Sequence, residues 1–152
     1  MRSALDVLIL GAGPAGCATA LALCRRGVAR VMLVDRPLAQ AFRIGEAATP
    51  DVPGLVAQLL GGTAANLPVP QRPYVGNLSH WGGVRRRDDF MRRGLAPGWQ
   101  LDRASFDQGL RELAMAAGAL LRCPARCNDV SRTPGGWAVA LDDGTAWQAR
   151  VL

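Results

Sequence analysis

A chain of 152 residues, of which 49% are apolar, can bury one hydrophobic core, so we expect a single domain and no extended disorder. No apolar run approaches the roughly 20 residues that a membrane span requires, and the first residues do not form a secretory signal. The net charge of +6 comes from arginine alone, because the sequence has no lysine, and the arginines are spread along the chain apart from one cluster. We therefore expect a cytoplasmic protein with no membrane span and no nucleic-acid partner.

The first three predicted elements form a βαβ unit. Residues 7–10 are a wholly apolar run, typical of a parallel strand that is buried on both faces. A helix is predicted from Pro14 through Arg26, with Gly27 as its C-terminal stop, and residues 31–34 are a second buried strand. Because parallel strands joined by a helix need a right-handed crossover, these elements predict a Rossmann-like unit in an α/β fold.

A connection and the start of a second small sheet are predicted next. A short helix begins at Thr49 and Pro50 and ends near Leu60. Residues 77–81 and 99–101 are strand-like, and we expect these two pieces to pair with each other.

The second half of the chain predicts a helix and then an antiparallel β-meander. Asp102 is placed to cap the helix at its first turn. The buried stripe of this helix is expected to be Phe106, Leu110, Leu113, Ala114 and Ala117. Residues 119–122 resume a strand, and Asp143-Gly144 is a hairpin turn within the alternating segments that follow.

A glycine-rich motif with dinucleotide-binding spacing joins the first strand to the first helix. It reads Gly11-Ala12-Gly13-Pro14-Ala15-Gly16, and Asp35 follows nineteen residues after its last glycine. Gly11 permits a tight turn, Gly13 lets a pyrophosphate approach the backbone, and Gly16 lets helix and strand pack closely. The helix N-terminus offers N–H donors to phosphates, and Asp35 would accept hydrogen bonds from the ribose hydroxyls. An acid there argues against NADP, but the motif alone leaves both NAD and FAD open.

Three segments carry a resemblance to a known family. Residues 6–36 resemble the start of flavoprotein monooxygenases of the p-hydroxybenzoate hydroxylase type, which include tryptophan-halogenase-like and geranylgeranyl-reductase-like branches. The segment Arg43-Ile44-Gly45-Glu46 with Pro50 is similar to the G-E-S-x-x-P segment of the halogenase-like branch, with Ala47 in place of the serine. Residues 98–107 are similar to its W-x-L-D-R-x-x-F-D segment.

The resemblance implies FAD as the cofactor and suggests which residues hold it. The ADP half would be held by Gly11, Gly13, Pro14, Ala15, Gly16, Asp35 and Arg36. Arg43 and Glu46 would lie near the ribityl and flavin, and Arg103 would reach the middle of the cofactor. Without the resemblance these last three would be a surface residue, a cap and a solvated side chain. No catalytic residue is assigned, and no metal site is expected.

The resemblance implies an FAD-dependent oxidoreductase, and more closely a monooxygenase that hydroxylates an organic or peptidyl substrate. Residues 74–83, taken with 98–107, most resemble flavoproteins that mature partner proteins, with NAD(P)H or a flavin reductase as electron source. Flavin halogenases use a lysine that this chain lacks, so hydroxylation or dehydrogenation is expected instead.

The family continues after the meander with A-T-G and G-D segments that this sequence does not contain. We therefore expect residues 1–152 to be the N-terminal part of an FAD-binding domain, apparently truncated, with 74–101 as the beginning of a substrate-domain insertion. A piece of a split enzyme, a non-catalytic dinucleotide-binding remnant and an NAD-dependent oxidoreductase stay open as alternatives.

The arginine cluster holds five arginines and two aspartates between Arg85 and Arg93, a local charge of +3. If the substrate is a protein, this cluster would steer an acidic partner to the flavin. The alternative is an ordinary solvated loop or hairpin, because interleaved acids are typical of exposed surface.

Overall fold

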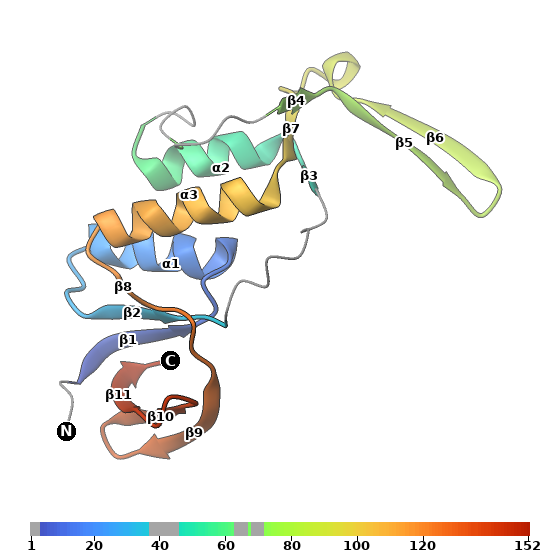
Figure 1. Cartoon of the computed structure of the whole chain (residues 1–152). Helices are drawn as coiled ribbons and strands as arrows, with labels where there is room; N and C mark the ends of the chain where they lie inside the picture. The colour runs from blue at the N-terminus through green and yellow to red at the C-terminus, as the bar shows by residue number, and fades with distance from the viewer. Residues whose placement is uncertain (1–3, 37–45, 63–66, 68–71) are drawn as a thin grey trace. The chain divides into compact units, whose positions relative to one another are not determined.

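The computed structural model describes residues 4–36, 46–62, 67 and 72–152 (Figure 1). The chain divides into two compact units. The first unit consists of residues 1–42 and 107–152, and the second consists of residues 43–106. Each unit has its own sheet structure.

A six-stranded mixed sheet, in the order β8-β2-β1-β11-β10-β9, forms the first unit. Its strands are β1 (Leu5–Leu10), β2 (Val31–Val34), β8 (Leu120–Arg122), β9 (Cys127–Thr133), β10 (Gly136–Leu141) and β11 (Ala146–Val151). β1, β2 and β8 are parallel neighbours, and β11 joins the other edge of β1 in parallel. β9, β10 and β11 pair antiparallel in sequence order. The predicted βαβ unit and the predicted meander are therefore confirmed, and they share one sheet.

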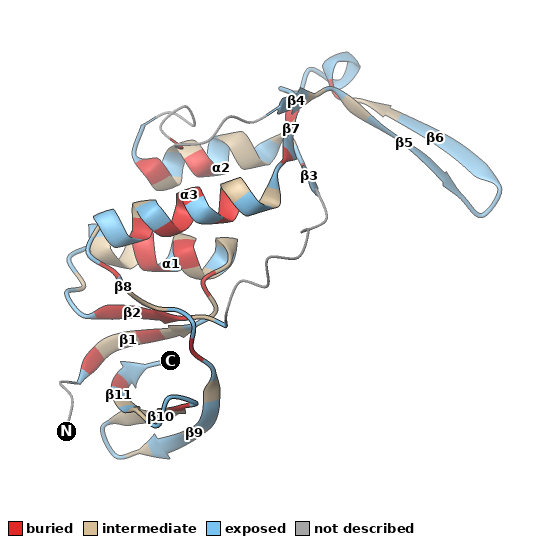
Figure 2. Cartoon of the chain, viewed as in Figure 1, coloured by how far each residue is buried: buried red, intermediate tan, exposed pale blue. Residues whose placement is uncertain are grey.

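Helix α1 (Pro14–Arg25) covers one face of the parallel strands. Its buried residues are Cys17, Ala20 and Leu21, so mostly small side chains face the sheet and the helix can lie close to it. All four residues of β2 are buried, as expected for a parallel strand with both faces covered (Figure 2).

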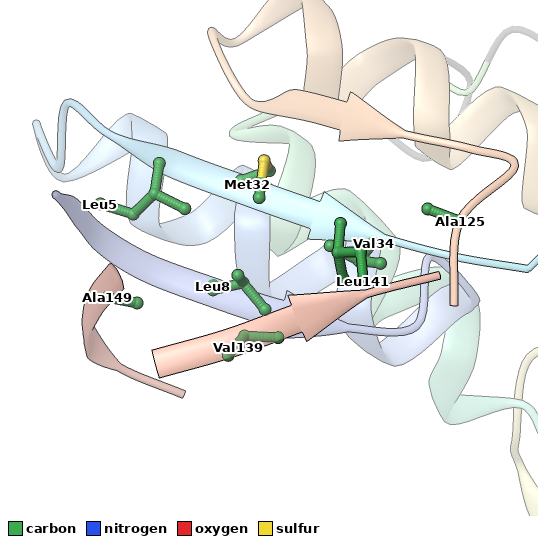
Figure 3. Close-up of a cluster of buried hydrophobic side chains, with 8 residues drawn as sticks. All are labelled: Leu5, Leu8, Met32, Val34, Ala125, Val139, Leu141 and Ala149. Carbon is green, nitrogen blue, oxygen red and sulfur yellow. The ribbon is translucent and has the colours of Figure 1, made fainter. Parts of the chain in front are cut away.

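On the face away from α1, side chains of the parallel strands β1 and β2 pack with side chains of the meander strands β10 and β11. Leu8, Met32 and Val34 alternate along their strands with Ile9 and Leu33, which point towards α1. The eight buried residues of this cluster are Leu5, Leu8, Met32, Val34, Ala125, Val139, Leu141 and Ala149 (Figure 3). Burying each of the larger aliphatic side chains contributes about 1.5 to 3 kcal/mol, so the cluster is a main source of stability for the first unit.

The second unit contains a three-stranded antiparallel sheet, a helix and a hairpin. The sheet has the order β3-β7-β4, with β3 (Glu46–Ala48), β7 (Gly98–Leu101) and β4 (Arg72–Tyr74). The hairpin consists of β5 (Gly76–Trp81) and β6 (Val84–Asp89), followed by a short 3-10 helix, Met91–Arg93. Helix α2 (Asp51–Leu60) ends, as predicted, at a glycine in the left-handed conformation, Gly61 with φ 64°.

Helix α3 (Arg103–Ala116) begins in the second unit and continues in the first. The Asp102 carboxylate accepts hydrogen bonds from the N–H groups of Ala104 and Ser105, at 3.1 and 3.4 Å, so the predicted cap is confirmed. Phe106, Leu110 and Ala114 are buried as predicted, whereas Leu113 and Ala117 of the predicted stripe are only partly buried. Two charged residues, Asp107 and Arg111, are also buried on this helix, and the apolar pattern did not predict them.

The pairing predicted between residues 77–81 and 99–101 is wrong. β5 pairs with β6, the strand that carries the arginine cluster, while β7 lies between β3 and β4. Gly82 and Gly83 connect β5 to β6 with φ values of 58° and 78°, which are favourable for a two-residue hairpin turn. Because this turn needs almost no loop closure, local pairing wins over pairing with a strand further along the chain.

No helix among the described residues is long and apolar enough to cross a membrane.

Whether residues 74–101 begin a substrate domain stays a prediction.

The burial of Cys17 generates a prediction about thiol reactivity. Burial raises the pKa of the Cys17 thiol to about 11, so only about one thiol in a thousand is ionised at pH 8. Cys123 is exposed. We expect iodoacetamide at pH 8 to alkylate Cys123 and to leave Cys17 intact in the folded chain, as measured by peptide mass mapping. Both should react in denaturant, and native alkylation of Cys17 as fast as Cys123 would show that its burial is wrong.

Candidate dinucleotide-binding site

The glycine motif forms a tight turn between β1 and α1. Gly11 has φ +108°, in the region that favours glycine, and its N–H donates to the carbonyl of Val34 at 2.7 Å. Gly13 caps α1 in an extended conformation with no side-chain cap, and Pro14 takes the first helical position. The N–H groups of the first helical turn have no partner inside the helix and are therefore oriented to bind an anion.

Two glycines of the motif differ in what a side chain would meet. A Cβ built at Gly16 would lie 1.9 Å from the carbonyl oxygen of Gly11, so close packing of the helix on the turn requires glycine there. A Cβ at Gly13 would meet nothing within 4 Å, and its φ of −80° is open to any residue. The protein's own packing does not need glycine at position 13. The open space fits a phosphate group that approaches the backbone.

Asp35 follows the end of β2, and each oxygen of its carboxylate accepts a hydrogen bond. Its Oδ1 accepts from the N–H of Arg36 at 2.9 Å, and its Oδ2 accepts from Nη2 of Arg111 at 2.6 Å. The Asp35 backbone is fixed as well, since its N–H donates to the carbonyl of Arg122 and its carbonyl accepts from Ala125. The side chain keeps 20% of its surface exposed, so the carboxylate can still meet a ligand.

A cleft of about 430 Å³ opens beside the turn and Asp35. Its lining residues are Leu10, Gly11, Val34, Asp35, Arg36, Ala125, Arg126 and Cys127. The cleft lies at the carboxyl ends of β1 and β2, where ligands bind in open α/β sheets, and its size is within the usual range of ligand pockets. The structure thus brings the predicted residues Gly11, Asp35 and Arg36 to one cleft.

Arg111 of α3 is part of this arrangement, and the sequence did not predict its role. Its Nε donates to the carbonyl of Ala12, inside the glycine motif, at 2.8 Å, and its Nη2 binds Asp35. The Cys17 thiol also donates to the Ala12 carbonyl, at 3.3 Å. A charge on the buried side of a predicted helix is a signal that it has a partner, because burying an unpaired charge is costly. The sequence does not say which residue the partner is.

Of the remaining predicted residues, Gly13 caps α1, Pro14, Ala15 and Gly16 form its first turn, and Glu46 and Arg103 lie in the second unit. Glu46 of β3 and Arg103 of α3 form an ion pair, because the β3–β7 register sets Glu46 opposite Leu101, two residues before Arg103. Arg43 lies outside the described residues. The assignment of all these residues to FAD stays a prediction, and so does that of the glycine turn.

The comparisons with known proteins agree with this architecture. Residues 4–43 match a family described as "FAD binding domain". The chain is 33% identical over 114 residues to "Putative FAD-dependent oxidoreductase LodB" of Marinomonas mediterranea, which covers 69% of this chain and 29% of LodB. It is 30% identical over 116 residues to a "1H-pyrrole-2-carbonyl-[peptidyl-carrier protein] brominase" of Pseudoalteromonas luteoviolacea, covering 74% of this chain and 27% of the brominase.

Solved structures share the fold over nearly the whole chain. "Peptidyl tryptophan dihydroxylase QhpG" aligns with a TM-score of 0.69 and 30% identity, over 98% of this chain and 32% of QhpG. The halogenase PltM aligns with a TM-score of 0.78 and 23% identity, over 98% of this chain and 34% of PltM. The chain belongs to the FAD-binding monooxygenase superfamily of the p-hydroxybenzoate hydroxylase type, as its resemblance predicted. It spans about a third of the length of these relatives.

The contrast between Gly13 and Gly16 gives a mutational prediction. Gly13→Val adds a branched side chain to open space, so we expect a nearly unchanged melting temperature but a loss of ADP binding of at least about tenfold. Gly16→Ala adds a Cβ where the Gly11 carbonyl lies and should cost about 1 to 3 kcal/mol of stability. Thermal melts followed by circular dichroism and calorimetric titration with ADP measure both. Gly13→Val with wild-type ADP affinity would show that phosphate does not approach this turn.

Proposed function

We propose that this chain supplies the ADP-binding part of the FAD site of a flavoprotein monooxygenase. The observation that carries the proposal is the open space at Gly13 beside a cleft lined by Asp35. A helix N-terminus that a phosphate can approach and a carboxylate at the end of the next strand are the two features by which this fold recognises a dinucleotide. The match of residues 4–43 to an FAD-binding family favours FAD over NAD.

In this proposal the predicted site residues bind different parts of FAD. The first-turn N–H groups of α1 bind the pyrophosphate, and Asp35 accepts hydrogen bonds from the ribose hydroxyls. Glu46 and Arg103, held together as an ion pair, contact the part of the cofactor nearer the flavin. Bound FAD, once reduced by NAD(P)H or by a flavin reductase, supplies the chemistry with oxygen. The protein binds and orients the cofactor.

A substrate carried on a polypeptide is the class that we propose. The names of two relatives specify such substrates, a peptidyl tryptophan for QhpG and a pyrrole on a peptidyl-carrier protein for the brominase. The absence of lysine from this chain favours hydroxylation over halogenation, given the lysine that flavin halogenases use.

FAD uptake by the purified chain tests the cofactor assignment. We expect FAD to raise the melting temperature, because a ligand that binds only the folded state stabilises it, and ADP to compete with FAD. FMN, which lacks the AMP moiety and so has no adenosine ribose, should compete far less than ADP. A chain that takes up no FAD, or that NADH stabilises more than FAD does, would contradict the proposal, and the second result would favour an NAD-dependent oxidoreductase.

The hairpin β5–β6 suits contact with a protein partner. Nearly all of its residues are exposed (Figure 2), including Trp81 at 88%, and its arginines include Arg85, Arg86 and Arg87. Two acidic residues neutralise part of this charge, since Asp88 forms an ion pair with Arg93 at 3.1 Å and Asp89 lies 3.6 Å from Arg87. Exposed aromatic and arginine side chains together are characteristic of protein interfaces. We propose that the hairpin attracts an acidic partner.

Neutralising these arginines tests the proposal for the hairpin. We expect Arg85→Gln/Arg86→Gln/Arg87→Gln to slow association with poly-L-glutamate about tenfold at low salt, because clustered charge raises association rates, and to leave FAD affinity unchanged. A control variant, Arg26→Gln/Arg132→Gln/Arg150→Gln, removes the same charge from exposed positions of the first unit. If both variants slow association equally, only net charge matters and the hairpin is ordinary surface.

A further inference from the structure

Arg111 joins two parts of the candidate site that are far apart in the sequence. Its Nε donates to the carbonyl of Ala12, 99 residues away, and its Nη2 donates to the carboxylate of Asp35, 76 residues away. The guanidinium is planar and rigid, so the angle between these two donors is fixed. One side chain therefore sets the glycine turn and the acid relative to each other.

The burial of Arg111 separates its role from direct ligand binding. Its side chain is 3% exposed, while that of Asp35 is 20% exposed. The carboxylate thus meets the cleft, and the guanidinium lies behind it. Asp107, on the same helix one turn before Arg111, is also buried, and the charges of Asp35, Asp107 and Arg111 all act on the Cys17 thiol. Two buried charges, Asp107 and Arg111, therefore lie near the partly exposed carboxylate of Asp35.

The contacts of Asp35 leave acceptor capacity for two further donors. A carboxylate has about four acceptor positions, two on each oxygen. Oδ1 uses one for the N–H of Arg36, and Oδ2 uses one for Arg111. Each oxygen then keeps about one position, which matches the two neighbouring hydroxyls of a ribose. Without Arg111, the carboxylate would lose the contact that holds Oδ2 and could rotate away from this arrangement.

We propose that Arg111 is a positioning residue, which orients Asp35 to recognise both ribose hydroxyls and so makes the site selective for ribonucleotides. The proposal rests on the proposed dinucleotide function and deepens it. In this proposal α3 contributes to cofactor recognition, because its Arg111 contacts both the glycine motif and Asp35. Lysine would not substitute, because a single ammonium on a flexible stem does not hold two acceptors in a fixed geometry.

The test compares ADP with 2′-deoxy-ADP, which lacks only the 2′-hydroxyl, one of the two ribose hydroxyls that Asp35 is proposed to bind. Calorimetric titration of the wild-type chain should show a preference for ADP of about tenfold, as expected for one hydrogen bond to a charged group. In Arg111→Met the preference should fall below about twofold. Arg111→Lys keeps the buried charge, so it guards against a variant that fails to fold, and it should also lose most of the preference.

The control is Arg30→Met, which breaks a 3.1 Å ion pair with Asp6 at the start of the parallel strands. It should keep the full preference for ADP. A purely structural role for Arg111 would weaken both nucleotides equally and leave their ratio unchanged, and that result, or a full preference in Arg111→Lys, would overturn the proposal. A wild-type chain that binds neither ADP nor FAD would contradict the proposed function and the role of Arg111 together. Wild-type binding with no preference for ADP would overturn the role of Arg111 alone.

Discussion

The N-terminus of α1 lies directly against the turn that ends β1, and this contact depends on residue 16 having no side chain. Even a Cβ at that position would overlap the carbonyl of Gly11. The contact brings the first-turn N–H groups of α1 to the carboxyl end of the sheet, where Asp35 follows β2. The helix end that we propose to bind a phosphate and the cleft lined by Asp35 therefore lie at the same end of the sheet.

A second constraint comes from α3, which the glycine turn alone does not anticipate. Burial of Arg111 beside the turn is tolerated because both of its described contacts are to strong acceptors, a carbonyl and a carboxylate. The candidate dinucleotide site is therefore not a local strand–turn–helix feature. It includes Arg111 from the second half of the chain, whose helix buries two charged residues, Asp107 and Arg111, besides apolar ones.

The sequence predicted the parts of the fold in which signals are local. β1, α1 and β2 follow from short apolar runs and a glycine motif, and Asp102 caps α3 because its partners are two and three residues away. β3 and β4, of three residues each, are too short to show a period. The predicted pairing of residues 77–81 with 99–101 is wrong because the Gly82-Gly83 turn favours a local hairpin between β5 and β6. The role of Arg111 depends on partners 76 and 99 residues away, so only the folded structure identifies them.

Backbone amide chemical shifts test the central claim, that the glycine turn and Asp35 form one nucleotide site, most directly. Titration of the isotope-labelled chain with ADP should move the amide signals of residues 11–13, 15 and 16 together with those of Asp35 and Arg36, with one common saturation curve. Signals from the β5–β6 hairpin should stay in place. Shifts that are confined to the hairpin, or that reach the turn and Asp35 with different affinities, would contradict a single site.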